Sequence, residues 1–167
     1  MWKTKKKQKR YYSGKKKKHT QKTQVVTTTT GKILAVSIDK GRIHDFKLLK
    51  KSKATRKIIL CKVLADLGYV GIDKICPNSK IPNKKTKKNP LTKDDKKENR
   101  KLSAERIIIE QINAKIKVFK IVKYPYRNRR KKFGLRMNLI CAIVNIDSEP
   151  IKTDVCEDWY LDVLGEV

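Results

Sequence analysis

Apolar residues along this chain fall into a few short runs, separated by long stretches of lysine and other polar residues. Segment 20–30, rich in Thr and Val, and segment 32–39 are separated by Gly31, and they predict the two strands of a hairpin. The nearly continuous apolar run 57–66 predicts a third strand, buried on both faces as in a parallel sheet. The remaining apolar stretches predict helices at 44–54, 103–122 and 135–146.

The helix expected at 103–122 has the clearest pattern. Ser103 is expected to cap its start. An apolar stripe at helical spacing follows, made of Ile108, Ile112, Ile116 and Phe119. The order strand, strand, helix, strand, helix, helix predicts an α/β fold, in which helices flank a mixed sheet.

Composition divides the chain into three segments. Residues 1–19 are basic and of low complexity, and residues 20–146 hold the predicted core. Within this core, residues 76–100 contain three prolines and many lysines, which predicts a solvated insertion. Residues 147–167 form an acidic tail.

Charge is the strongest compositional signal. Lys and Arg number 44 against 16 Asp and Glu, which gives a formal net charge of +28. Residues 147–167 hold seven acids and one base, so the other 146 residues carry +34. Such a body repels itself unless a polyanion is bound, and lysines that neutralise phosphates release counterions. Nucleic acid is therefore the predicted partner, although lysine-rich tails on an ordinary domain would give the same composition.

The sequence argues against a zinc protein and a membrane protein. None of the four cysteines is arranged as C-x-x-C, and the chain has only two histidines. The N-terminus lacks the apolar region of a signal peptide, and the apolar runs are too short to span a bilayer. A cytoplasmic, nucleoid-associated location is expected.

Three acidic residues are candidates for catalysis. Asp66 ends the predicted strand 57–66, and catalytic groups of open α/β sheets gather at the carboxyl ends of strands. Glu110 lies beside the buried stripe of a predicted helix, where a carboxylate is costly unless it is paired or bound to metal. Asp45 follows His44 and could sit near a metal. Each has an ordinary alternative: a turn residue for Asp66, a solvated helix face for Glu110, and a helix N-cap for Asp45.

Carboxylates from distant segments on a basic body suggest phosphodiester cleavage. This reaction uses divalent cations that activate water and stabilise the leaving oxygen, commonly as a pair of ions. Magnesium prefers carboxylate and water oxygens as ligands. Lysines around such a site would hold the DNA.

The chain resembles insertion-sequence transposases of the DDE superfamily, in the group with a Harbinger-like endonuclease domain. The stretches that carry the resemblance keep their order and spacing over roughly 135 residues. They are YYSGKKKKHTQKTQVV at 11–26, GRIHDFKLLKKSK at 41–53, VLADLGYVGIDKI at 63–75, KKTKKNPLTKDDKKENRKLSAERIIIEQINAKIKVFKI at 84–121 and YRNRRKKFGLRMNLICAIVN at 126–145.

This resemblance implies a ribonuclease-H-like fold and the metal-dependent cleavage and transfer of DNA strands at transposon ends, with Mg²⁺ or Mn²⁺. By motif, Asp66 corresponds to the second catalytic Asp and Glu110 to the catalytic Glu. Asp45, in IHD, matches a position assigned to metal binding, although less closely. The implied partner is double-stranded DNA at transposon ends and targets, and self-association or association with a full-length transposase is compatible with it. The DNA-binding candidates are Lys15, Lys16, Lys17, Lys18, Arg127, Arg129, Arg130, Lys131 and Lys132.

The chain also departs from the family pattern. Relatives carry a first catalytic Asp in a strand shortly before YYSGK, whereas residues 1–10 contain no acid. The chain is therefore expected to lack the first, central strand of the sheet, to be a truncated copy, and to be inactive. Its acidic end does not look like that of the family. A non-catalytic basic protein that binds nucleic acid is the alternative function, and an inactive DNA-binding fragment is a further reading.

Overall fold

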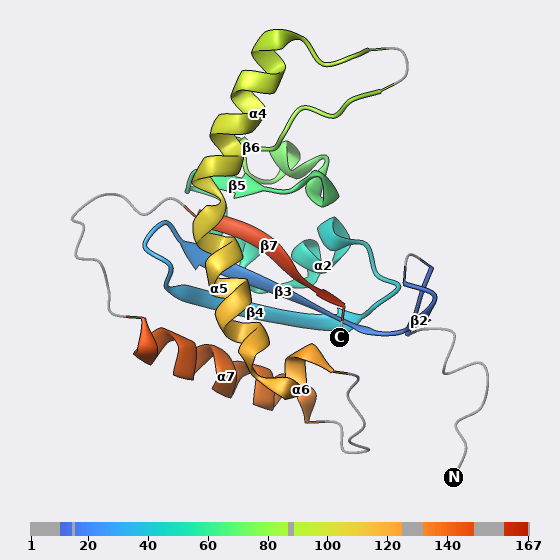
Figure 1. Ribbon diagram of the computed structural model, residues 1–167, viewed down its shortest axis with the longest axis vertical. Helices are drawn as coiled ribbons and strands as arrows, with labels where there is room; N and C mark the ends of the chain where they lie inside the picture. The colour runs from blue at the N-terminus through green and yellow to red at the C-terminus, as the bar shows by residue number, and fades with distance from the viewer. Residues whose placement is uncertain (1–10, 15, 87–88, 125–131, 149–158, 167) are drawn as a thin grey trace.

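The computed structural model describes residues 11–14, 16–86, 89–124, 132–148 and 159–166, and the last of these segments for its backbone alone (Figure 1). The strands are β1 (Tyr12–Ser13), β2 (Lys18–His19), β3 (Gln21–Thr28), β4 (Ile33–Lys40), β5 (Val63–Ala65), β6 (Ser79–Lys80) and β7 (Trp159–Glu166). The helices are α2 (Asp45–Lys51), α3 (Thr55–Ile58), α4 (Lys93–Glu105), α5 (Ile107–Val118), α6 (Lys120–Lys123) and α7 (Phe133–Asp147), with single 3₁₀ turns η1 (Leu67–Tyr69) and η2 (Ile72–Lys74).

The main sheet has five strands in the order β4-β3-β7-β5-β6, and β1 and β2 form a separate small hairpin. β3 and β4 pair antiparallel, as the predicted hairpin requires. Thr and Val residues suit the extended backbone of β3, and Gly31 adopts a φ of +86° in the turn, a conformation that glycine reaches without strain. β5 pairs parallel with β6.

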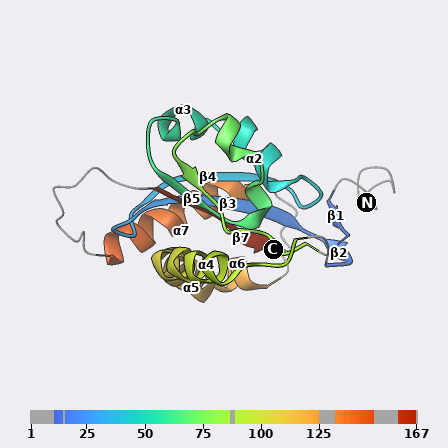
Figure 2. The same ribbon diagram turned by 90° about the horizontal axis from the view of Figure 1, so that it is seen from above.

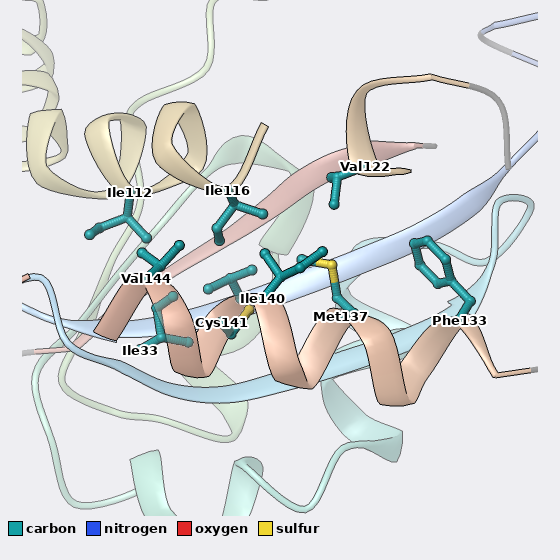
Figure 3. Close-up of a cluster of buried hydrophobic side chains, with 10 residues drawn as sticks. Ile33, Ile112, Ile116, Val122, Phe133, Met137, Ile140, Cys141 and Val144 are labelled. Carbon is teal, nitrogen blue, oxygen red and sulfur yellow. The ribbon is translucent and has the colours of Figure 1, made fainter. Parts of the chain in front are cut away.

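Helices cover both faces of this sheet (Figure 2). α2 and α3 lie on one face, where Leu49 and Ile58 pack with Val63 and Ala65 of β5. α5 and α7 cover the other face. There, Ile112 and Ile116 of α5 meet the side chains of α7 above the hairpin (Figure 3).

Asn145, near the end of α7, fixes this helix to the hairpin. Its Oδ1 accepts a hydrogen bond from the Ile33 N–H at 2.8 Å, and its Nδ2 donates to the Ile33 carbonyl at 2.9 Å. Because both backbone groups of Ile33 are satisfied by one side chain, α7 and the start of β4 are held in a defined register. The expected helix 135–146 is confirmed as α7.

The predicted strand 57–66 is largely wrong. The apolar run begins at the end of α3, continues through a turn, and becomes a strand only at Val63–Ala65. Leu60 is 89% exposed, so the run is not a continuous core strand. Short apolar runs do not distinguish a strand from a buried helical turn, because burial and not periodicity sets their composition.

The helix predicted at 103–122 is divided and begins earlier. α4 starts at Lys93 with a capping box, in which Thr92 and Asp95 bond to each other's backbone N–H. These hydrogen bonds from Thr92 lower the pKa of Asp95. Ser103 lies inside α4 and is not a cap, and helical structure is interrupted at Arg106 and at Phe119. Part of the expected insertion 76–100 is therefore helical.

The central position of the sheet is filled, contrary to the prediction that the chain lacks this strand. β7, from the acidic tail, lies between β3 and β5, antiparallel to the former and parallel to the latter (Figure 1). The tail was interpreted by its charge, whereas strand pairing depends on the backbone. Both neighbouring strands thus have partners for the N–H and C=O groups that would otherwise be exposed.

No helix in the described part of the chain is both long enough and apolar enough to cross a membrane.

Candidate active site at the carboxyl end of β5

Asp66 lies where the sequence predicted it, at the carboxyl end of a buried strand. The three residues of β5 are buried, and Asp66 follows them with an extended backbone. Its Oδ1 accepts a hydrogen bond from the Leu67 N–H at 2.7 Å, which caps η1. Half of the Asp66 side chain is exposed. The core strand therefore ends in a carboxylate that solvent reaches.

Arg106 connects Asp66 to the start of α5. Its Nη1 lies 3.5 Å from Asp66 Oδ1, and its side chain is only 14% exposed. Glu110 follows one helical turn later, with its N–H donating to the Arg106 carbonyl, and Glu110 is exposed. Residues four apart lie on the same side of a helix. The ion pair therefore links Asp66 to the start of α5, one helical turn before Glu110.

Asp45, the third candidate, begins α2 and already has a cationic partner. Its Oδ1 lies 2.7 Å from Lys22 Nζ, which also donates to the Ile43 carbonyl at 2.6 Å. The two side chains are 26% and 10% exposed. This ion pair neutralises Asp45 inside the protein. Asp45 would bind a metal only in competition with Lys22.

Gly68 brings the turn after Asp66 into contact with Asp45. A Cβ atom on Gly68 would lie 2.5 Å from Asp45 Oδ2, so no larger residue fits without movement. Asp45 and Asp66 therefore border the same turn, η1, from two sides. Asp66 stands at its start, and Asp45 packs on its backbone.

The described residues do not form a closed metal site. Among them, no three His, Cys, Asp or Glu side chains are grouped so that they could hold a metal ion. Mg²⁺ keeps several waters and is usually bound by one or two carboxylates together with substrate phosphates. Asp66 and Glu110 are the residues that would hold it. Arg106 balances part of the charge of Asp66 when no cation is bound.

The proposed DNA-binding residues are described only in part. Lys16, Lys17 and Lys18 are exposed on the hairpin of β1 and β2, and Lys132 is exposed at the start of α7. The other candidates lie outside the described residues: Lys15, Arg127, Arg129, Arg130 and Lys131.

A basic surface on α4 was missed because its segment was interpreted as an insertion. Its exposed cations are Lys93, Lys96, Lys97, Arg100 and Lys101, and the first four share one side of the helix. Leu102 on another side of α4 is buried against α5 and β5. The first turns of α4 project from the body of the protein (Figure 1). α4 therefore offers a row of positive charges to a polyanion.

Lys22, Arg106 and the contact of Gly68 with Asp45 were also missed. Arg106 could have been suspected from its position four residues before Glu110, since this spacing places both on one side of a helix. Lys22 and Gly68 gave no such signal. Their partners are distant in sequence, and the fold alone brings them together.

Comparison with known proteins identifies the family of this chain. No solved structure matches the chain significantly. A protein of Microchaete diplosiphon, described as "Probable transposase for insertion sequence element IS702", is 46% identical over 118 residues. These residues are 71% of this chain but 42% of that protein, so the chain spans less than half the length of its relative. The profile of the DDE superfamily endonuclease family matches residues 2–145. The chain therefore belongs to the DDE superfamily endonuclease family.

Proposed function

We propose that this chain forms the catalytic core of an insertion-sequence transposase, which cleaves and transfers DNA strands with the help of Mg²⁺ or Mn²⁺. The observation that carries the proposal is the position of Asp66. This half-exposed carboxylate ends a buried strand and contacts Arg106, one turn from Glu110. The family match and the name of the relative support the same chemistry.

Asp66 and Glu110 are assigned as catalytic, metal-binding residues in this proposal. A divalent cation held there would activate water and stabilise the leaving oxygen of the phosphodiester. Asp45 is the less direct candidate because Lys22 occupies its carboxylate. Within this proposal, the arrangement of strands is ribonuclease-H-like. A mixed five-stranded sheet with helices on both faces supports that assignment.

The expectation that the chain is inactive had two grounds, a missing strand and a missing first Asp. β7 removes the first ground, because it occupies the centre of the sheet. The second ground concerns one carboxylate. Residues 1–10 contain no acid that would supply it.

Nicking of supercoiled DNA tests the proposal. The chain is incubated with Mg²⁺ or Mn²⁺ and a plasmid that carries insertion-sequence ends, and relaxed product is measured by electrophoresis. We expect nicking that EDTA abolishes and that Asp66→Asn and Glu110→Gln reduce by about 10²-fold or more. Asp73→Asn is the matched control, because Asp73 is exposed and lies outside the site. Nicking that persists undiminished in Asp66→Asn would refute the assignment.

A non-catalytic DNA-binding function is the second candidate, and the cations of α4 favour it. Both candidates predict binding to double-stranded DNA that weakens steeply with salt. If α4 contacts phosphates, replacing Lys93, Lys96 and Lys97 with Ala lowers the slope of log affinity against log salt by roughly one unit per lost contact. The matched control is the triple Ala variant of Lys47, Lys50 and Lys51 in α2, on the opposite face of the sheet. Strong binding without any cation-dependent nicking would favour this second function.

A further inference from the structure

β7 is placed by its backbone pairing with two strands at once. Its antiparallel register with β3 pairs Val25 with Asp162. Its parallel register with β5 pairs Val63 with Trp159 and Ala65 with Leu161. β5 and β7 run parallel, so the next residue of each strand after the pair Ala65 and Leu161 is Asp66 on one side and Asp162 on the other. The register therefore sets an acidic residue of the C-terminal strand next to the candidate catalytic Asp66.

The register also places Asp162 on one face of the sheet. Residues paired across strands share a face, and successive residues alternate between faces. The partner of Asp162 is Val25, which belongs to the cluster beneath α5 and α7. Leu64, two residues before Asp66, packs against Ile109 of α5. Asp162 and Asp66 thus belong to the face that α5 covers.

α5 packs directly on β7, and it carries Glu110 next to Ile109. Three acidic residues from distant segments are therefore brought to one region: Asp66 after β5, Glu110 on α5 and Asp162 on β7. None of these segments is adjacent to another in the sequence. Only the insertion of β7 between β3 and β5 unites them.

We propose that Asp162 is a third metal-binding residue of the site. This inference rests on the proposed function, because it assigns a residue to the same divalent-cation site. The acids of the site then follow one another along the chain as Asp66, Glu110 and Asp162. The contribution of Asp162 requires that the C-terminal strand is docked in the sheet.

The spacing of strands supports a shared cation at this position. Neighbouring parallel strands lie about 4.8 Å apart, so the register sets the backbones of the two acidic residues side by side. Arg106 is the cation already found beside Asp66, at 3.5 Å. A divalent cation would take ligands from more than one acidic residue, since hard cations prefer several oxygen ligands.

Calorimetric titration with Mn²⁺ tests the proposal without requiring turnover. Asp162→Asn and Asp66→Asn remove one charge each and keep the size of the side chain, and Asp73→Asn is the matched control at an exposed position. We expect the first two variants to weaken Mn²⁺ binding at least tenfold and the control to bind as the unchanged chain does. Far-UV circular dichroism and urea midpoints verify that equal amounts of folded protein are compared.

A second variant separates metal binding from docking of the strand. Asp162→Glu keeps a carboxylate and is expected to bind Mn²⁺ more tightly than Asp162→Asn, at a similar urea midpoint. Equal binding by these two variants would overturn the role of Asp162.

The outcomes also distinguish this inference from the proposed function. If Asp66→Asn weakens binding and Asp162→Asn does not, the inference fails while the proposed site stands. If the unchanged chain binds no Mn²⁺, or if neither variant weakens binding, both are wrong.

Discussion

Replacing Gly68 with Ala tests whether the turn after Asp66 is held in place by Asp45. The new Cβ would lie 2.5 Å from Asp45 Oδ2 and 3.3 Å from its Cγ, closer than side-chain contacts allow. Asp45 cannot easily move away, because its Oδ1 lies 2.7 Å from Lys22 Nζ. Overpacking of this kind costs about 1–3 kcal/mol. Loss of chain entropy in the unfolded state offsets about 0.4–1 kcal/mol of it.

We therefore expect Gly68→Ala to lower the free energy of unfolding by about 1–2 kcal/mol, measured by urea denaturation. Gly14→Ala is the matched control, because nothing lies within 4 Å of the Cβ that it would add. This control should be neutral or slightly stabilising. It shares the entropic gain of the Gly68 variant without the steric contact.

A double-mutant cycle with Asp45→Ala identifies the source of the cost. Asp45→Ala is destabilising by itself, because it leaves the nearly buried Lys22 without this carboxylate. However, it removes the two closest atoms and leaves Asp45 Cβ, at an ordinary 3.5 Å. Gly68→Ala should then cost little in the Asp45→Ala background, giving a coupling of about 1–3 kcal/mol. Equal penalties in both backgrounds would refute the contact between η1 and Asp45.

Two further predictions concern α7 and its neighbours. Asn145→Ala removes both hydrogen bonds to the backbone of Ile33 and should lower the free energy of unfolding by about 2–4 kcal/mol, whereas Asn138→Ala, at an exposed position of α7, should change it little. Burial raises the pKa of the Cys141 thiol to about 11 from 9.0, so the folded state favours the protonated thiol. The corresponding stability is present below pH 9 and is lost as pH rises through 11. Between pH 8 and pH 11 the unchanged chain should therefore lose about 2 kcal/mol more than Cys141→Ala in urea denaturation; identical pH profiles would contradict this.

Elements with a local signal were predictable from the sequence. The hairpin of β3 and β4 has strand-forming residues on both sides of Gly31, and α7 has an apolar run of helical length. Each pattern depends on residues that are close in the chain. The start of α4 was also readable, because Thr92 and Asp95 have the spacing of a capping box, but the surrounding lysines favoured a solvated insertion.

The position of β7 could not be predicted, because it is determined by strands that are distant in sequence, with Val63 of β5 paired to Trp159 and Val25 of β3 paired to Asp162. Its segment was interpreted from average charge, which concealed the aromatic and aliphatic residues among the acids. A strand is recognised by its neighbours as much as by its own sequence, and β3 and β5 both lacked a partner between them. The need for a central strand was therefore predictable, while its origin was not.

In the candidate site, too, some features have a local sequence signal and others depend on distant contacts. Asp66 and Glu110 could be identified from motifs, and Asp66 from its position after an apolar run. Their environment depends on contacts across the fold: Arg106 reaches Asp66 from α5, and Lys22 reaches Asp45 from β3. Sequence patterns indicate which carboxylates could take part in the chemistry. They do not show which basic side chain pairs with each carboxylate.

The charge of the C-terminal segment has a physical consequence for its place in the sheet. It carries seven acids and one base, whereas the rest of the chain carries +34. A lysine-rich strand between β3 and β5 would add to this repulsion, but an acidic strand relieves it. The register pairs Glu166 of β7 with Lys22 of β3, so an acidic position of the tail stands opposite a basic position of the hairpin. At Asp162 the register sets the backbone beside Val25 of β3 on one side and beside Asp66, the residue after β5, on the other. The acidic composition of the tail thus favours its docking in the basic body as a whole.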